Sequence, residues 1–108
     1  MDCVFCRIIE KKAPARIVYE DDETIAFHDI HPSAPIHLLI CPKKHYSTLL
    51  ETPPDVQPAL FRAVRKIAEQ LGVDEDGFRL IINQGRDGGQ IVYHLHIHFL
   101  AGRKQRGF

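Results

Sequence analysis

The segment His94-Leu-His-Ile-His-Phe-Leu100 alternates imidazole and apolar side chains without a break, near the end of a 108-residue chain. Successive side chains of a β-strand point to opposite faces, so this alternation predicts a strand over 94–100. One face would carry three imidazoles, those of His94, His96 and His98. The other face would pack against a helix and hold the strand rigid, through Leu95, Ile97 and Phe99.

A lone histidine on a strand is usually structural, whereas three in register favour a functional site. The outer two would lie about 13 Å apart on a strand that rises roughly 3.3 Å per residue, which is too far for one tetrahedral metal to bind all three. A catalytic three-histidine metal centre is therefore disfavoured, and we expect the three imidazoles to have different roles.

Other elements follow from hydrophobic periodicity and turn residues. Runs of β-branched, aromatic and apolar residues predict four further strands, over 17–19, 24–28, 37–41 and 78–83. Apolar residues at helical spacing predict a helix over 56–71, with Asp55 as its cap and Gly72 at its end. A shorter helix is expected around 45–50. The fold class is therefore α+β on an antiparallel sheet, as a single domain over 1–108.

The charge balance excludes several classes of partner. Fourteen basic residues offset fourteen acidic residues, so no overall field would attract nucleic acid or an anionic membrane surface. No run approaches the roughly eighteen apolar residues of a membrane span. The N-terminus, MDCVFCRII, has acidic Asp2 and no basic region before a long apolar run, so we expect a cytoplasmic protein.

Cys3 and Cys6 form a C-x2-C pair, a spacing that occurs both in metal sites and in redox thiol pairs. A redox motif would follow a strand within a βαβ unit, and no strand precedes this pair. The position therefore favours structural zinc, with histidines as the remaining ligands. The alternative is a pair of free thiols in a metal-free protein. Cys41 lies in an apolar run and is expected to be a buried, inert thiol.

Three glycines precede the histidine segment, at positions 85, 88 and 89. Glycine lets a backbone approach a ligand closely and expose N–H groups to a phosphate. A plain hairpin turn is the alternative reading. The neighbouring imidazoles favour an anion site.

The histidine segment and the residues before it resemble a known family. The segment Asn83-Gln-Gly-Arg-Asp-Gly-Gly-Gln-Ile-Val-Tyr-His-Leu-His-Ile-His98 is similar to the signature of the histidine-triad family, His-φ-His-φ-His-φ-φ with φ apolar, and especially to its nucleoside phosphoramidase branch, also called protein kinase C inhibitor-like. The segments over 27–30, 34–37 and 42–45 resemble family segments in the same order. The resemblance implies a five-stranded antiparallel sheet with two helices, paired into a homodimer whose sheets join.

The resemblance also implies roles for individual residues. His96 would be the nucleophile, His98 and His37 would flank the phosphate, and Asn83 would orient the phosphate region. Asp29 would bind the ribose hydroxyls. The purine base would lie among apolar side chains, namely Val4, Phe5, Ile8, Phe27, Ile30 and Leu39. Several members of the family, and the related galactose-1-phosphate uridylyltransferases, hold zinc with residues that correspond to Cys3, Cys6, His45 and His94.

The chemistry agrees with these roles. Neutral imidazole is an available nucleophile at pH 7, and it forms a phosphorus–nitrogen bond that water can cleave. A cationic histidine and the Gly88 and Gly89 amides could stabilise charge on the phosphoryl oxygens. We therefore expect an enzyme that hydrolyses purine nucleoside phosphoramidates, without an organic cofactor. The alternatives are a dinucleoside polyphosphate hydrolase and a zinc-stabilised adaptor that binds purine nucleotides with vestigial catalysis.

The chain departs from the family pattern at Ile91, where many members carry a serine or threonine. Isoleucine offers the substrate only its backbone N–H, so we expect the reaction class to persist with a changed rate or leaving-group preference. The tail over 103–108 lacks the aromatic-proline ending of some relatives. The remaining polar residues of these segments are expected to be surface groups, namely His28, His31, Lys43 and Lys44.

Overall fold

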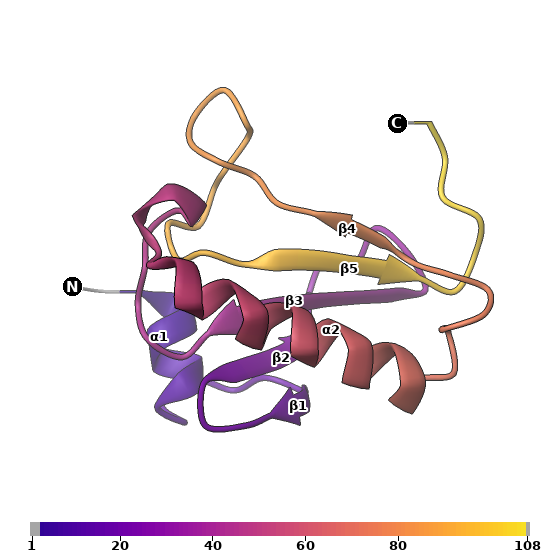
Figure 1. The fold of residues 1–108 in the computed structure, drawn as a ribbon, viewed down its shortest axis with the longest axis horizontal. Coiled ribbons are helices and arrows are strands. Elements are labelled where there is room, and N and C mark those ends of the chain that lie inside the picture. Colours follow the sequence, from indigo (N-terminus) through magenta and orange to yellow (C-terminus); the bar gives the residue numbers. More distant parts are fainter. Residues whose placement is uncertain (1–2, 108) are drawn as a thin grey trace.

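The computed structural model describes residues 3–107, so Asp2 and the tail residue Phe108 lie outside it (Figure 1). Its helices are α1 (Val4–Ile9) and α2 (Gln57–Gln70), with 3-10 turns at Leu49–Glu51 and Pro54–Val56. Its strands are β1 (Ile17–Glu20), β2 (Thr24–His28), β3 (Ile36–Pro42), β4 (Arg79–Ile81) and β5 (Ile97–Ala101). None of the helices in the described range is long and apolar enough to span a membrane.

The five strands form one antiparallel sheet in the order β1-β2-β3-β5-β4. The expected α+β fold, a five-stranded antiparallel sheet with two helices, is confirmed. β5 lies between β3 and β4, an adjacency that sequence order left open. In this register Leu39 of β3 is paired with His98 of β5, and His37 is paired with Leu100.

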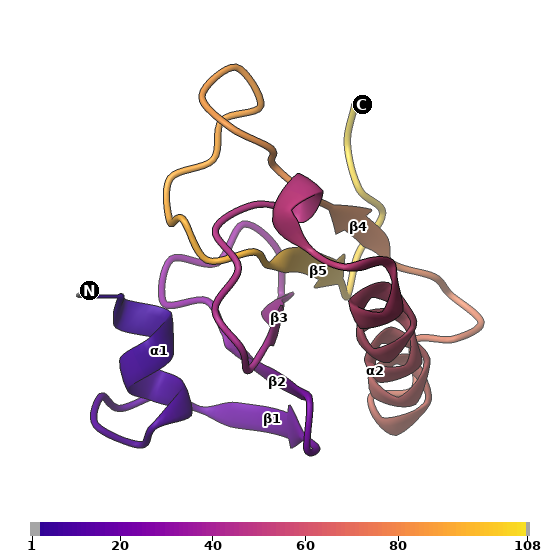
Figure 2. The same cartoon turned by 60° about the vertical axis from the view of Figure 1, so that its left-hand side comes forward.

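Each helix covers one face of the sheet (Figure 2). Alternate strand residues point toward α2, including Ala26, Leu38, Ile40, Ile97 and Phe99. The intervening residues share a second cluster with Phe5 and Ile8 of α1, namely Ile25, Phe27, Leu39 and Cys41. The two-residue period of the strands therefore separates a core under α2 from a face that α1 covers only at one end.

Helix α2 follows the predicted periodicity closely. Its buried residues recur at helical spacing on the sheet side: Ala59, Leu60, Ala63, Val64, Ile67 and Ala68. Gly72 ends it as predicted, with a positive φ of 70° that suits the residue after a helix. Asp55 does not cap it, because a 3-10 turn intervenes and the cap residue is Val56, which makes no side-chain hydrogen bond.

The prediction of a shorter helix around 45–50, ahead of α2, is wrong. Helix α1 instead occupies Val4–Ile9, where the Cys3 Sγ accepts a hydrogen bond from the Cys6 N–H at 3.4 Å. Six residues are too few to form a stable helix alone, so packing of Phe5 and Ile8 on the sheet stabilises it. The 45–50 segment is held by contacts to other parts of the chain.

The prediction of one strand over 94–100 is wrong at its start, since β5 begins at Ile97. The Leu95 N–H donates to the Tyr46 carbonyl at 2.7 Å instead of to a neighbouring strand. The alternation nevertheless persists. Leu95 is buried in the core under α2, whereas the rings of His94 and His96 both lie against Phe5 of α1, with centroids 5.9 and 5.1 Å away.

Candidate active site

A cavity of about 710 Å³ opens on the α1 side of the sheet. It is lined by α1, the ends of β2 and β3, the glycine-containing loop and two of the three histidines of the triad segment. Apart from Gly85 and Gly88, which do not line it, the residues expected to bind substrate or react with it all line this one cavity: Val4, Phe5, Ile8, Phe27, Asp29, Ile30, His37, Leu39, Asn83, Gly89, Ile91, His96 and His98.

The apolar residues divide into a buried floor and an exposed rim. Phe5, Phe27 and Leu39 are buried and lie at the base of the cavity. Ile30 is 84% exposed and Ile91 is 89% exposed, so both lie at the mouth. A flat apolar ligand group would therefore be enclosed by the floor and reach solvent between these two isoleucines.

Several lining residues had no predicted role, namely Arg7, Ala13, Pro14, Ala15, His28, His31, Ser33 and Val92. The residues at 13–15 follow α1. Because this helix was not predicted, their position beside the cavity could not be predicted either. His28 and His31 were expected to be surface groups. His28 is half-buried at the end of β2, where burial and the Arg16 charge lower its imidazole pKa.

His37 and His98 are diagonal neighbours on adjacent strands, and their rings form one hydrogen-bonded chain. The Ser33 backbone N–H donates to Nδ1 of His37 at 2.9 Å. An N–H group can only donate, so neutral His37 carries its proton on Nε2. That Nε2–H donates to Nδ1 of His98 at 3.0 Å. His98 consequently carries its own proton on Nε2, at the end of the chain.

Both imidazoles are biased toward the neutral form. Burial lowers the pKa of His37, against the opposing effect of the Asp29 carboxylate. Burial, together with the neighbouring His96 and His37, lowers the pKa of His98 to about 4. At neutral pH His98 is therefore a neutral donor.

Asp29 is held by the loop that follows β2. Its Oδ1 accepts the His31 N–H at 2.8 Å, and its Oδ2 lies 3.4 Å from Nε2 of His37. Asp29, His37 and His98 place one ligand atom each within 4.8 Å of the others. A metal at this cluster is disfavoured, because Ser33 leaves the proton of His37 on the nitrogen that would face the metal.

His96 has the opposite tautomer to His98. Its Nδ1 lies 2.7 Å from the His94 carbonyl oxygen, which can only accept, so Nδ1 carries the proton. The Nε2 lone pair is therefore unprotonated on a ring that lines the cavity. Burial lowers the pKa of His96, which keeps this lone pair available at neutral pH.

The loop over 83–92 is fixed by side-chain contacts to backbone groups. Asn83 Nδ2 donates to the Gly88 carbonyl at 2.7 Å. Gln90 is buried, its Oε1 accepting the Gly85 N–H at 2.9 Å and its Nε2 donating to the Ser47 carbonyl at 2.7 Å. These contacts hold the loop beside the 45–50 segment.

The two loop glycines have different environments. The Gly89 N–H donates to the Arg86 carbonyl at 3.0 Å, and Gly89 lines the cavity. A Cβ on Gly88 would lie 2.4 Å from the Gln84 carbonyl oxygen, so close packing requires glycine there. No hydrogen bond among the described residues uses the Ile91 N–H, which therefore remains available to a ligand.

Four side chains predicted to bind metal converge beside this cavity: Cys3, Cys6, His45 and His94. Cys6 Sγ lies 3.3 Å from Nδ1 of His45 and 3.6 Å from Nδ1 of His94, Cys3 Sγ lies 3.5 Å from Nδ1 of His94, and the two Nδ1 atoms lie 3.1 Å apart. Tetrahedral zinc, with bonds of about 2.3 Å to sulfur and about 2.0 Å to nitrogen, separates its ligands by about 3.5 Å for S···N and about 3.3 Å for N···N. The cluster therefore fits zinc.

Hydrogen bonds orient His94 for this role. Its Nε2 lies 2.8 Å from the Pro42 carbonyl oxygen, so Nε2 carries the proton and the Nδ1 lone pair faces the cysteines. Burial and the Cys3 thiol raise the pKa of Cys6 to about 11.

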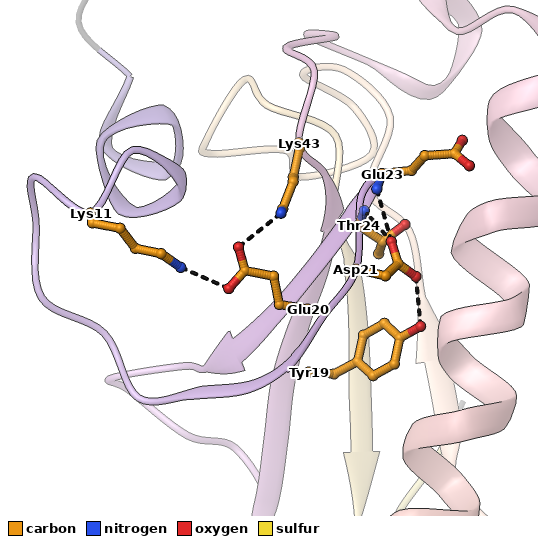
Figure 3. Close-up of polar contacts among 7 residues, drawn as sticks. All are labelled: Lys11, Tyr19, Glu20, Asp21, Glu23, Thr24 and Lys43. Atoms are coloured by element: carbon orange, nitrogen blue, oxygen red, sulfur yellow. Dashed lines mark hydrogen bonds and ion pairs between the residues drawn. The ribbon is translucent and has the colours of Figure 1, made fainter.

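A carboxylate joins two of the three segments that carry the metal-cluster residues (Figure 3). Glu20 of β1 contacts Nζ of Lys11 at 2.7 Å and Nζ of Lys43 at 2.8 Å. Lys11 follows α1, which carries Cys6, and Lys43 precedes His45 on the chain. Lys43 is thus a partly exposed charge with an ion-pair partner, and it does not line the cavity. Lys44 lies over the Tyr46 ring, 5.8 Å from its centroid.

Comparisons with known proteins agree with this architecture. The HIT domain family matches residues 10–105. The chain is 47% identical over 105 residues to the purine nucleoside phosphoramidase of Escherichia coli strain K12, covering 94% of this chain and 88% of that protein. It is 46% identical over 102 residues to protein HitA of Neisseria gonorrhoeae, covering 93% and 95% respectively.

The solved structure of a histidine triad protein from Clostridium difficile superposes with a TM-score of 0.96 at 47% sequence identity, covering 100% of this chain and 96% of that one. The family match thus extends over most of the chain and the structural match over all of it. The chain belongs to the HIT domain family, the histidine-triad proteins.

Proposed function

We propose that this HIT protein is a nucleotide hydrolase of the purine nucleoside phosphoramidase type, acting through a covalent nucleotidyl-His96 intermediate. The observation that carries the proposal is the hydrogen bond from Nδ1–H of His96 to the His94 carbonyl, which leaves the Nε2 lone pair unprotonated. The name of the Escherichia coli relative supports the substrate class.

In the first step, Nε2 of His96 attacks the phosphorus of a nucleoside 5′-phosphoramidate. A bond from nitrogen of His96 to phosphorus forms, and the bond from phosphorus to the amine nitrogen breaks. The departing amine takes its proton from a solvent water molecule, which becomes hydroxide. Nε2–H of His98, the free end of the Ser33, His37 and His98 chain, donates a hydrogen bond to the departing nitrogen. Protonation avoids expulsion of an amide anion, which would be a very poor leaving group.

In the second step, this hydroxide attacks the same phosphorus and the bond from His96 to phosphorus breaks, which returns His96 to neutral imidazole. The products are a nucleoside monophosphate and the enzyme in its starting protonation state.

The remaining lining residues bind the nucleotide in this proposal. The purine would lie against the buried floor formed by Phe5, Phe27 and Leu39. Asp29, whose orientation is set by its hydrogen bond from His31, would accept ribose hydroxyls. The Asn83 side chain and the Ile91 N–H would face the phosphate.

Zinc would be held by Cys3, Cys6, His45 and His94, the four residues whose ligand atoms fit a tetrahedral ion. Such a set fills the coordination sphere, so the ion would supply structural stability and leave no open position for substrate. It would tie the N-terminal helix to the segment that precedes His96.

The assembly proposed is a homodimer joined at a sheet edge. β1 and β4 are the edge strands of the five-stranded sheet within the described residues, so each offers unpaired backbone groups to a second copy. Sedimentation equilibrium tests this assembly, with twice the chain mass as the expected result and the chain mass as the contradicting one.

The proposed activity is tested by steady-state turnover of an adenosine phosphoramidate and of a dinucleoside polyphosphate on one preparation of enzyme. We expect faster turnover of the phosphoramidate, and no turnover of either by His96→Ala, which should still bind nucleoside monophosphate. Preference for the polyphosphate would favour the alternative hydrolase. Nucleotide binding without turnover of either substrate would favour the adaptor.

A further inference from the structure

The C-terminal tail contacts the loop over 30–35 at two points. Arg103 Nη2 donates to the Ser33 carbonyl at 2.8 Å. Gly102 has a φ of +96°, and a Cβ placed on it would lie 2.9 Å from Cβ of Pro35. Glycine at this position therefore lets the tail lie close against the loop while Arg103 reaches Ser33.

Ser33 is hydrogen-bonded through both of its backbone groups. Its carbonyl accepts from Arg103, and its N–H donates to Nδ1 of His37 at 2.9 Å. A continuous chain of hydrogen bonds consequently runs from the tail through Ser33 and His37 to His98.

The direction of this chain depends on Ser33. A pair of neutral imidazoles joined by one hydrogen bond can carry its protons in either of two arrangements. With the Ser33 N–H in place, His37 donates to His98, and His98 has its proton on Nε2. Without the Ser33 N–H, His37 can carry its proton on Nδ1 and accept at Nε2. His98 then carries its proton on Nδ1, from which it donates to His37, and its Nε2 is unprotonated.

The Asp29 carboxylate also favours the arrangement in which His37 carries its proton on Nε2. Its Oδ2 accepts 3.4 Å from Nε2 of His37, which is long for a hydrogen bond. The contact between the Ser33 N–H and Nδ1 of His37 is shorter, at 2.9 Å, and a backbone N–H can only be the donor. Ser33 is itself exposed in a loop, so its peptide groups depend on a partner to hold their orientation.

We propose that Arg103 is a positioning residue, which by binding the Ser33 carbonyl fixes the tautomer of His37 and thereby the proton on Nε2 of His98. The catalytic consequence rests on the proposed function, in which that N–H donates a hydrogen bond to the leaving amine. The tautomer itself does not depend on any activity.

The test compares three full-length proteins: wild type, Arg103→Ala and Arg106→Ala. Arg106 is the matched control, since it is an arginine in the same tail whose contact is made by its backbone carbonyl, which accepts from Arg79. Histidine tautomers are read from two-bond ¹H–¹⁵N correlations of ¹⁵N-histidine-labelled protein, and kcat and KM are measured with an adenosine phosphoramidate. Arg103→Lys, which keeps a donor at the end of a long side chain, is the rescue variant.

In wild type and Arg106→Ala, we expect His37 to show a protonated Nε2 and an unprotonated Nδ1. In Arg103→Ala, the His37 and His98 signals should shift toward a mixture of tautomers. kcat should fall by about tenfold, the scale on which outer-shell hydrogen-bond partners act, with KM unchanged within about twofold. Arg103→Lys should recover part of both effects.

Unchanged tautomers in Arg103→Ala would overturn the proposal, whatever happens to kcat, because a rate loss alone would then reflect a merely structural role. Equal effects in Arg106→Ala would also overturn it. If wild type turned over no substrate, the proposed function would fail, and the tautomer measurement would still decide whether Arg103 sets the proton position.

Discussion

Nε2 of His37 lies 3.0 Å from Nδ1 of His98, and this contact joins β3 to β5 in the middle of the sheet. The Ser33 N–H makes His37 the donor, so the exposed proton of the pair is on His98. His96, two residues earlier, has its proton on the other nitrogen. The rings of His96 and His98, proposed as nucleophile and as hydrogen-bond donor to the leaving group, lie side by side with centroids 5.0 Å apart.

Replacement of His98 by alanine tests the assignment of the hydrogen-bond donor to the leaving group. We expect kcat to fall by about 10²- to 10³-fold for phosphoramidates, whose departing nitrogen that N–H would stabilise. A nucleotide ester of p-nitrophenol, whose leaving group is stable without such a donor, should lose much less. Equal losses for both substrates would contradict a role at the leaving group. His96→Gly serves as the comparison, since it should lose both activities.

The stability of the protein should depend on pH through His98. Its folded pKa is lowered to about 4 by burial and by His96 and His37, whereas an unfolded histidine titrates near pH 6.5. Between these values the unfolded chain binds more protons, so the free energy of unfolding falls as the pH drops from about 6.5 to about 4. One such group contributes at most about 1.4 kcal/mol per pH unit.

Urea unfolding at several pH values between 7 and 5 measures this effect, with wild type and His98→Gln compared at equal metal content. The variant should lose stability less steeply on acidification. Parallel pH dependences for the two proteins would contradict the lowered pKa of His98.

Removal of the metal should destabilise the protein. We expect one zinc per chain by elemental analysis, and a lower melting temperature after chelation, because the ion would join α1 to the segment before His96. Cys6→Ser should lose the zinc and melt lower. Cys41→Ala is the matched control, since Cys41 is a buried cysteine outside the four-residue cluster. Absence of zinc from wild type grown with zinc would contradict the structural role.

Glu20 should contribute modestly through its two lysines. Hydrogen bonds from Lys11 and Lys43 lower the pKa of its carboxyl group. Glu20→Gln should reduce the free energy of unfolding by about 1 kcal/mol, since partly exposed ion pairs are weak and screened by salt. The loss should shrink at high salt. Glu10→Gln, which removes a more exposed pair with Lys12 at 3.5 Å, is the control and should change stability less.

Parts of the fold were predictable because they repeat a simple period. The α2 periodicity located that helix, and alternation in the triad segment separated the apolar face from the imidazole face. The helix at Val4–Ile9 was not predictable on the same grounds, since it is short and depends on packing of Phe5 and Ile8. The start of β5 at Ile97 could not be predicted either, because it results from a hydrogen bond between Leu95 and Tyr46, which are far apart in the sequence.

The sequence predicted which residues form the site, but not which nitrogen of each histidine carries the proton. The spacing of the histidines indicated different roles for them, and the family resemblance assigned His94 to the metal cluster and His96 and His98 to the phosphate. Their tautomers could not be read from the sequence, because each is set by a backbone group, the carbonyls of Pro42 and His94 and the N–H of Ser33. Ser33 was missed for this reason, since it acts through its backbone.

The central claim is that Nε2 of His96 becomes covalently bonded to phosphorus, and mass spectrometry of acid-quenched enzyme tests it most directly. Wild type mixed with an adenosine phosphoramidate and quenched during turnover should gain one adenylyl group on the peptide that contains His96. A turnover-competent enzyme with no adduct, or with an adduct that persists in His96→Gly, would contradict the account.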